Sequence, residues 1–145
     1  MAKILIASDH AGFHSKEELK KHFTSEHEFI DFGPNSSDSV DYPDYAHLLS
    51  QKISESKDSF GILICGSGIG MSMVANRYKD VRAALCLNEK MAQLSREHNN
   101  ANVLVLGSRL ISCEEAIKCL IMFFKSKFEG NRHQARLDKF NDVKM

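Results

Sequence analysis

Cys65 and the glycine-rich segment after it are the residues in this sequence best suited to chemistry. Residues 60–65 form a short apolar run that predicts a buried strand, and the apolar spacing of residues 69–78 predicts a helix. The glycines between them, at positions 66, 68 and 70, allow the backbone to approach a ligand closely. The N–H groups that begin the helix have no partners within it. The pattern therefore predicts an anion-binding loop with a thiol at its edge.

The fingerprints of the common phosphate-binding loops do not fit this segment. The dinucleotide pattern G-x-G-x-x-G would need glycine at position 71 or 73, and both positions are methionine. A Walker loop would need lysine after Gly70, and a cysteine phosphatase would need arginine at position 71. The loop is therefore expected to stabilise a delocalised oxyanion, and not to bind a nucleotide or form a phosphocysteine.

Cys65 itself can be interpreted in two ways. Taken alone, a cysteine in an apolar segment is more often a small core residue. Its predicted position before a helix N-terminus favours the thiolate, because the helix dipole is positive at that end. We therefore interpret Cys65 as a base or a nucleophile.

Histidines and arginines elsewhere could complete a site for an anion. His10 and His14 have the spacing of metal ligands, but His10 falls in the turn before a predicted helix, so a metal is the weaker interpretation. Arg132 and Arg136 fall on one helical face, where they either face solvent or bind a phosphate dianion. His98 alone is typical of a solvated loop residue.

The apolar pattern predicts five strands that alternate with helices and would position these residues. The strands are expected at Lys3–Ser8, Glu28–Phe32, Phe60–Cys65, Val81–Leu87 and Asn102–Leu106. The first helix is expected from a capping box at Ser15 and Glu18 to about Thr24, and the second follows a polar loop over Asn35–Asp44. The third is expected from Ile69 to Tyr78, and the fourth from the cap Asn88 to near Glu97. The last is expected from a capping box at Ser112 and Glu115 to Gly130. This alternation predicts a Rossmann-like α/β fold, a three-layer α/β/α sandwich with a five-stranded parallel sheet.

Ligands of such sheets bind beyond the carboxyl ends of the strands. Asp9 and His10 follow the first predicted strand, the glycine loop follows the third, and Arg109 follows the fifth, so we expect these segments at one edge. His98 precedes the fifth strand, which places it at the opposite end. This conflict indicates a site that is shared between the subunits of an oligomer.

The composition excludes several classes of protein. With 145 residues, the chain is long enough for one well-buried core and too short for two ordinary domains. Its 19 basic and 19 acidic residues give no net charge, so nucleic acid and anionic membrane are not expected partners. Signal-peptide and membrane-spanning patterns are missing, and the four cysteines form no C-x-x-C pair, which indicates reduced thiols. We predict a cytoplasmic protein with one domain over residues 1–145.

Six ordered motifs cover essentially the whole chain. They are D-H-A-G at 9–12, D-Y-P at 41–43, I-C-G-S-G-I-G at 64–70, S-R-E-H-N-N at 95–100, G-S-R at 107–109 and G-N-R-H-Q-A-R at 130–136. Together they resemble the ribose 5-phosphate isomerase B family, which includes allose and galactose 6-phosphate isomerases. The resemblance implies an aldose–ketose isomerase of the pentose phosphate pathway that works as a homodimer, without cofactor or metal. Whether dimers pair further stays open.

The resemblance also implies a role for individual residues. Cys65 would move a proton between C2 and C1 through a cis-enediolate, His98 would open the furanose ring, and Asp9 would help to hold the sugar. Backbone N–H groups of the loop would stabilise the enediolate, from Gly66, Ser67, Gly68, Ile69 and Gly70. Asn99 and Tyr42 would line the sugar pocket. The phosphate would be held by His10, Arg109, Arg132 and Arg136, and the tail from about residue 130 would complete a site in its own or the partner subunit.

One branch of this family replaces the cysteine base by a glutamate directly after the last glycine of the loop. This chain has Met71 at that position, so we expect the cysteine-base branch. Ser67 stands where threonine is also common, and Asn131 stands where glycine is common. Neither difference removes a proposed functional group.

Two other functions stay open. Allose 6-phosphate or galactose 6-phosphate could replace ribose 5-phosphate, because the depth of the pocket decides this and a sequence does not show it. A non-enzymatic sensor of sugar phosphates would use the same loop. Such a sensor would need neither Cys65 nor His98, so the presence of both favours the enzyme.

Overall fold

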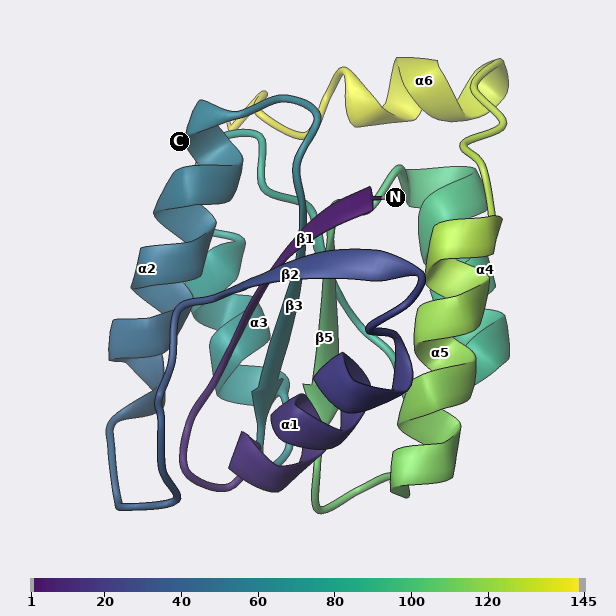
Figure 1. Cartoon of the computed structure of the whole chain (residues 1–145). Helices are drawn as coiled ribbons and strands as arrows, with labels where there is room; N and C mark the ends of the chain where they lie inside the picture. Colours follow the sequence, from purple (N-terminus) through teal and green to yellow (C-terminus); the bar gives the residue numbers. More distant parts are fainter. Residues whose placement is uncertain (1, 144–145) are drawn as a thin grey trace.

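The computed structural model describes residues 2–143, and strands alternate with helices along the chain (Figure 1). The strands are β1 (Ala2–Ser8), β2 (His27–Asp31), β3 (Phe60–Cys65), β4 (Ala83–Leu85) and β5 (Val103–Gly107). The helices are α1 (Phe13–His22), α2 (Tyr42–Glu55), α3 (Ile69–Ala75), α4 (Glu89–Asn99), α5 (Cys113–Lys125) and α6 (Arg132–Leu137).

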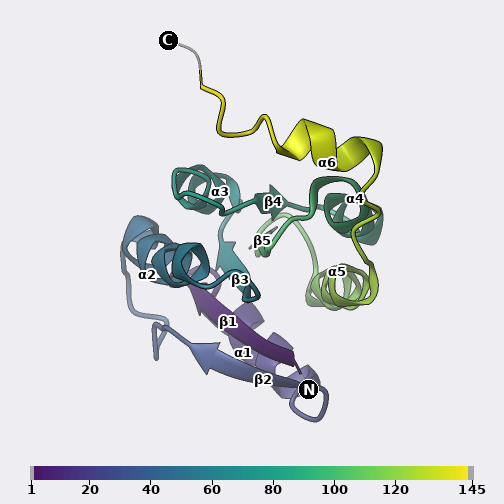
Figure 2. The same cartoon turned by 90° about the horizontal axis from the view of Figure 1, so that it is seen from above.

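The five strands form one parallel sheet in the order β2-β1-β3-β5-β4. Helices α1, α4 and α5 cover one face of this sheet, and α2 and α3 cover the other (Figure 2). The first face buries Leu19 and Phe123, and the second buries Leu49 and Met71, each without exposed surface. Apolar burial on both faces is what a parallel sheet requires. The predicted three-layer α/β/α sandwich is confirmed.

The central strands β1, β3 and β5 end at the same level. Ser8 of β1 is aligned with Ile64 of β3, and Cys65 of β3 is aligned with Gly107 of β5. The connection after β1 leads to α1 on one face, whereas the connection after β3 leads to α3 on the other face. In open α/β sheets, ligands bind where two such connections diverge. A ligand-binding site is therefore expected at the loops that follow Ser8 and Cys65.

Helix α1 begins differently from the prediction. Ser15 and Glu18 do not form a capping box, because both lie inside the helix. The Asp9 carboxylate instead accepts a hydrogen bond from the Gly12 N–H at 3.0 Å. Glycine is required at position 12 because a Cβ there would lie 2.5 Å from the carbonyl oxygen of Ile64. The close approach of α1 to β3 thus moves the start of the helix towards Asp9.

The other two predicted caps are present. The side-chain oxygen of Asn88 accepts a hydrogen bond from the Met91 N–H at 2.9 Å and begins α4. The hydroxyl of Ser112 accepts from the Glu115 N–H at 3.1 Å and begins α5. Each side chain satisfies one backbone donor that the first helical turn leaves free.

Several predicted boundaries were wrong. Helix α2 begins at Tyr42, inside the predicted loop, because proline is well tolerated in a first helical turn. Helix α4 continues through Asn99, so His98 lies in its last turn and not in a linker. Helix α5 ends at Lys125, before Gly130 is reached. Strand β4 and helix α3 are shorter than predicted, and β2 and β5 are displaced by one residue.

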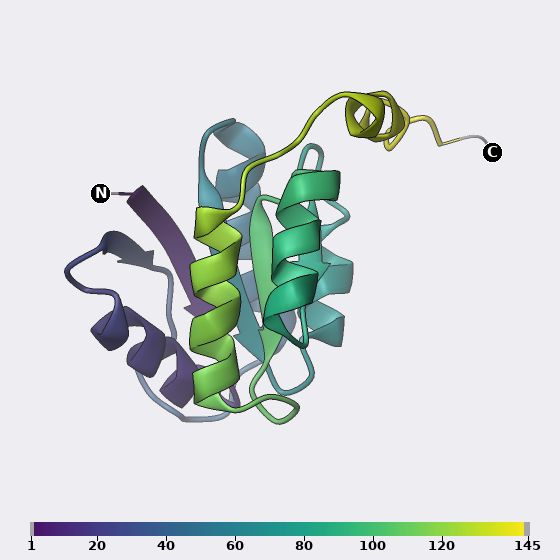
Figure 3. The same ribbon diagram turned by 90° about the vertical axis from the view of Figure 1, so that its right-hand side faces the viewer.

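Helix α6 lies at the amino-terminal ends of the strands, opposite to the edge that carries Cys65 (Figures 1 and 3). The chain reaches it through residues 126–131, which leave the end of α5. The Glu129 N–H donates to the Glu97 carbonyl oxygen at 3.0 Å, which ties this segment to α4. Within residues 2–143, the structure contains no helix of the length and hydropathy that a membrane span needs.

Candidate functional site

Cys65 is the last residue of β3, and the loop after it folds back over the sulfur atom. The Gly68 N–H donates a hydrogen bond to Cys65 Sγ at 3.2 Å. Gly68 has a φ of 79°, and a Cβ there would lie 2.5 Å from Leu85 Cδ1, so only glycine fits. Cys65 as a whole is 5% exposed. An N–H aimed at sulfur stabilises the thiolate, which is the form of cysteine that can accept a proton.

The loop after β5 packs on the Cys65 loop and brings Arg109 beside it. The Arg109 N–H donates to the Gly66 carbonyl oxygen at 2.9 Å, and the Ser108 N–H donates to the Cys65 carbonyl oxygen at 2.9 Å. A Cβ at Gly66 would lie 3.1 Å from Arg109 Nη1, so the guanidinium group lies against the loop. Arg109 is exposed and can bind an anion at this edge.

Tyr42 lies over the far end of the same loop. A Cβ at Gly70 would lie 2.4 Å from Tyr42 Cε1, so the ring and the glycine are in close contact. Tyr42 keeps 38% of its surface exposed at the start of α2. Within the loop, the hydroxyl of Ser67 accepts a hydrogen bond from the Ile69 N–H at 3.2 Å. The phenol is therefore positioned to contact a molecule bound over the loop.

Asp9 and His10 follow β1 and meet the same edge. The Asp9 N–H donates to the Ile64 carbonyl oxygen at 3.1 Å, which fixes the buried Asp9 beside β3. His10 Nδ1 lies 3.1 Å from both the nitrogen and the carbonyl oxygen of Val40, which hold the ring in place. In the tautomer in which Nδ1 accepts the Val40 N–H, Nε2 carries the proton and can donate to an anion. The structure thus brings together at one edge Asp9, His10, Tyr42, the loop from Gly66 to Gly70, and Arg109.

The remaining predicted residues lie at the other end of the molecule. His98 and Asn99 are in the last turn of α4, and Arg132 and Arg136 are in α6 (Figures 1 and 3). Both arginines are exposed on one short helix, as their spacing predicted. A single chain does not bring this group to Cys65.

Two neighbours of His98 were not predicted from the sequence. The rings of His98 and His133 are stacked, with centroids 4.3 Å apart and an interplanar angle of 16°. Glu129 Oε1 lies 3.4 Å from His133 Nε2 and 3.9 Å from His98 Nε2. The spacing of Glu129 and His133, four residues apart, was the available signal, but their contact with His98 depends on the tertiary fold.

Burial and charge act in the same direction on His133. Its burial, together with the nearby cationic group of Arg132 and with His98, holds the pKa of His133 below its ordinary value. The carboxylate of Glu129 opposes this effect. The imidazole of His133 is therefore held in its neutral form near pH 7.

Arg96 anchors the end of α4 that carries His98. Its Nη1 donates to the Asn100 side-chain oxygen at 2.9 Å and to the Ala101 carbonyl oxygen at 2.6 Å. The guanidinium lies 5.0 Å from the ring centroid of Phe60, which adds a cation–π contact. Burial lowers the pKa of Arg96 from its ordinary value. This buried cation fixes the geometry of the segment around His98.

All four cysteines are free thiols, as predicted, but three of them are poor candidates for proton transfer. Burial raises the pKa of Cys86 to about 11 and the pKa of Cys119 to about 12, so both stay protonated in the core. Burial also raises the pKa of Cys113, with a smaller effect from Glu18. Only Cys65 combines a strand end with an N–H donor to its sulfur.

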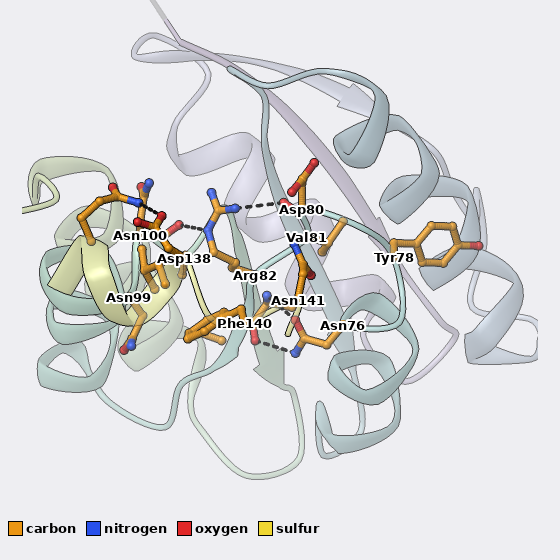
Figure 4. A pocket seen from close by; sticks show the side chains of 15 residues that line it. Asn76, Tyr78, Asp80, Val81, Arg82, Asn99, Asn100, Asp138, Phe140 and Asn141 are labelled. Carbon is orange, nitrogen blue, oxygen red and sulfur yellow. Dashed lines mark hydrogen bonds between the residues drawn. The ribbon is translucent and has the colours of Figure 1, made fainter. Parts of the chain in front are cut away.

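A cavity of about 750 Å³ lies beside β4 (Figure 4), and Cys65 is not among the residues that line it. It is lined by residues between positions 76 and 84, by residues 99–101 at the end of α4, by α6 and by the segment after α6. Inside it, Arg82 donates to the carbonyl oxygens of Asn100 at 2.7 Å and Asp80 at 3.1 Å. Asn99 is the one predicted site residue in its lining. The lining includes the carboxylates of Asp80 and Asp138 but neither Cys65 nor the glycine loop, so we place the candidate site at the Cys65 loop.

Comparisons with known proteins identify the family of this chain. The family model described as ribose/galactose isomerase matches residues 4–140. A probable ribose-5-phosphate isomerase B from Mycoplasma genitalium is 48% identical over 139 residues, which cover 94% of this chain and 91% of that protein. The ribose-5-phosphate isomerase B of Escherichia coli is 39% identical over 144 residues, which cover 99% and 97% of the two chains.

Solved structures have the same fold. A ribose 5-phosphate isomerase from Thermotoga maritima is 50% identical and superposes with a TM-score of 0.93, covering 97% of this chain and 98% of that one. Ribose-5-phosphate isomerase B from Mycoplasma genitalium, solved with bound ribulose-5-phosphate, is 47% identical with a TM-score of 0.91, covering 95% and 93%. The match along nearly the whole sequence and fold establishes that this chain belongs to the ribose/galactose isomerase family.

Proposed function

We propose that this chain interconverts ribose 5-phosphate and ribulose 5-phosphate by proton transfer through a cis-enediolate. The similarity to ribose-5-phosphate isomerase B proteins supports this proposal, and one such structure contains ribulose-5-phosphate. The observation that carries it is the hydrogen bond from the Gly68 N–H to Cys65 Sγ. That contact places a sulfur base beside a loop whose backbone N–H groups can donate hydrogen bonds to a sugar oxygen that becomes negatively charged.

In the proposed reaction, the Cys65 thiolate removes the C2 proton of the open-chain aldose. The electron pair forms the C1–C2 double bond, and negative charge develops on O1, where N–H groups of the loop stabilise it. The proton on O2 then passes to O1, the Cys65 thiol returns its proton to C1, and the product has a hydroxyl at C1 and a ketone at C2. This sequence needs a base and oxyanion donors and uses neither a metal nor a coenzyme.

Met71 supports the choice of Cys65 as the base. It occupies the position at which one branch of the family has a catalytic glutamate. The Met71 side chain has no exposed surface and belongs to the core beneath α3. A thioether cannot accept the C2 proton, so at this turn the sulfur of Cys65 is the base that we propose.

We propose that each active site is shared by two copies of the chain. The Cys65 loop lies at one end of the molecule, and His98 with the arginines of α6 lies at the other (Figure 1). A two-fold pair that joins unlike ends would form two equivalent sites. In each site, His98 would open the furanose ring while Arg132 and Arg136 would join His10 in holding the phosphate.

Exposed apolar side chains around β4 support this pairing. Ile69 and Met73 of α3 are 46% and 62% exposed, and Leu87 and Met91 near the start of α4 are 45% and 39% exposed. Ile69 belongs to the Cys65 loop itself, so this surface adjoins the proposed site. Permanent subunit interfaces are more apolar than the rest of a protein surface. A second copy is the occupant that would also complete the chemistry.

The proposal assigns the chain to the pentose phosphate pathway and to the cytoplasm, where these sugar phosphates are interconverted. A substrate panel tests it. We expect purified protein to isomerise ribose 5-phosphate faster than allose 6-phosphate or galactose 6-phosphate, with and without a chelator. Preference for a hexose phosphate would overturn the proposed substrate. Binding of sugar phosphate without any turnover would replace the enzyme by a sensor.

A further inference from the structure

We propose that His98, Glu129 and His133 form a binding site for a divalent transition-metal ion such as Zn²⁺, and that the bound ion inhibits the enzyme. The binding site is argued from the side chains alone. The inhibition rests on the function proposed above for His98, because the metal would take the lone pair that ring opening needs.

The three side chains already converge. One ligand atom from each lies within 4.8 Å of the others. Glu129 Oε1 is 3.4 Å from His133 Nε2 and 3.9 Å from His98 Nε2. Two ligands of a tetrahedral zinc ion lie about 3.4 Å apart when each metal–ligand bond is about 2.1 Å. The stacked rings of His98 and His133 would have to tilt apart for both nitrogen lone pairs to face one ion, so binding requires rotation of the exposed His98 and Glu129 side chains.

His133 Nε2 gives an independent indication of a ligand. The His133 side chain is 7% exposed, and this nitrogen has no hydrogen-bond partner among the described residues, because the contact with Glu129 lacks hydrogen-bond geometry. A buried polar nitrogen without a partner is costly and needs an explanation. A metal ion would use its lone pair and remove the cost.

The backbone holds the ligands in place. The Glu129 N–H donates to the Glu97 carbonyl oxygen at 3.0 Å, next to His98 in α4. The His133 N–H donates to the Gly130 carbonyl oxygen at 2.9 Å and begins α6. Glu129 and His133, four residues apart, thus meet on one side of α4.

The donor set selects the kind of ion. Two imidazole nitrogens and one carboxylate oxygen suit zinc and its neighbours, whereas magnesium and calcium prefer all-oxygen sites. His98 and Glu129 are 38% and 46% exposed, so one side is open for an entering ion and a fourth ligand. The positive charges of Arg132 and Arg136 on α6 oppose a cation and would reduce its affinity.

Binding is tested on the intact protein with Co²⁺ as a spectroscopic probe and Zn²⁺ in calorimetry. We expect one ion per chain, with visible absorption bands of tetrahedral cobalt and no sulfur-to-cobalt band. Glu129→Gln and His133→Gln should each weaken binding at least tenfold, and the exposed His22→Gln should not change it. Absence of binding, equal binding by all variants, or a sulfur band would overturn the site.

Inhibition is measured separately with ribose 5-phosphate. Zn²⁺ should inhibit the wild-type chain and the His22→Gln variant, a chelator should reverse this, and Glu129→Gln should keep its basal activity while resisting the metal. Inhibition that persists in Glu129→Gln would place the ion elsewhere, with Cys65 the first suspect, and would overturn the regulatory role. If the purified chain proves to have no isomerase activity, the cobalt spectrum still decides whether the site exists.

Discussion

The Gly68 N–H lies 3.2 Å from Cys65 Sγ and donates a hydrogen bond to it. Gly68 also begins α3, so the donor to the sulfur belongs to the turn that leads into a helix. The sulfur is thereby fixed at the end of β3, level with the end of β5. This contact is the basis for the first two predictions.

Replacing Cys65 by serine should remove the base and keep the site. We expect the turnover of ribose 5-phosphate to fall by roughly 10²–10⁴, because a hydroxyl is a far weaker base than a thiolate. Sugar-phosphate affinity, measured by calorimetry, should change little, since Arg109 and the loop remain. Near-normal turnover by Cys65→Ser would remove this residue from the mechanism.

Gly68→Ala should distort the loop. Its φ of 79° already costs about 1–2 kcal/mol for an L-residue, and the new Cβ would lie 2.5 Å from Leu85 Cδ1. Gly130→Ala is the matched control, because Gly130 has a φ of 70° and open space around its Cα. Denaturant unfolding should show a larger loss for Gly68→Ala, accompanied by loss of turnover. Equal losses in the two variants would show that the loop tolerates a side chain.

A hybrid of two defective chains tests the shared site. Cys65→Ser and His98→Asn should each be impaired as pure proteins. Mixed by unfolding and refolding, they should recover activity, because one of the two sites in a hybrid dimer would contain an intact Cys65 and an intact His98. Light scattering should report a dimer. If both residues of a site came from one chain, mixing would restore nothing.

Asp31 should link stability to acidic pH. Burial alone would raise the pKa of Asp31, but hydrogen bonds from Lys16 and Lys20 and from the Gly33 N–H outweigh it and lower the pKa below 3.8. The folded carboxylate thus binds its proton at lower pH than the unfolded one. Its contribution is fully present above about pH 4 and is lost as the pH falls through the folded pKa.

Asp31→Asn should remove that pH dependence and destabilise the protein at pH 7. Lys16 is completely buried and lies 2.8 Å from Asp31, so the variant leaves the buried ammonium with only the more distant and more exposed carboxylate of Glu17, 3.6 Å away. We expect a loss of about 3–5 kcal/mol in urea unfolding. Asp38→Asn, at an exposed carboxylate, should change stability by less than about 0.5 kcal/mol. Similar values for both variants would contradict the role of this ion pair.

Arg96→Lys should loosen the end of α4 while conserving charge. Lysine cannot reproduce the planar contacts of the guanidinium with Phe60 or its two hydrogen bonds, which reach Asn100 and Ala101. We expect the free energy of unfolding to fall by about 1–3 kcal/mol. We also expect a lower turnover of ribose 5-phosphate, because His98 follows in the same helix. The exposed Arg77→Lys is the control, and unchanged stability in Arg96→Lys would contradict the anchor.

The sequence was sufficient for the fold because apolar strands and amphipathic helices alternate without interruption. It also separated the two groups of site residues, since a residue that follows a parallel strand and one that precedes a strand lie at opposite ends of the sheet. Helix starts were less predictable. Ser15 and Glu18 have the spacing of a capping box, but the contact of Gly12 with Ile64 and the carboxylate of Asp9 start α1 earlier.

Contacts between distant segments were not accessible from sequence. The ring of Tyr42 against Gly70 depends on how α2 packs beside α3. The stack of His98 on His133 depends on the loop that returns from α5 to α4. Residue spacing indicates which side chains are neighbours within one helix or strand, but it does not indicate contacts between elements that are far apart in the sequence.

Cys65 and His98 lie at opposite ends of one chain, so under the proposed shared site a solitary protomer would possess every reactive group and no working pocket. At extreme dilution, where protomers separate, the measured rate should then vary with the square of enzyme concentration. In a cell, the total isomerase activity would then rise more steeply than the amount of protein until nearly all chains are dimeric.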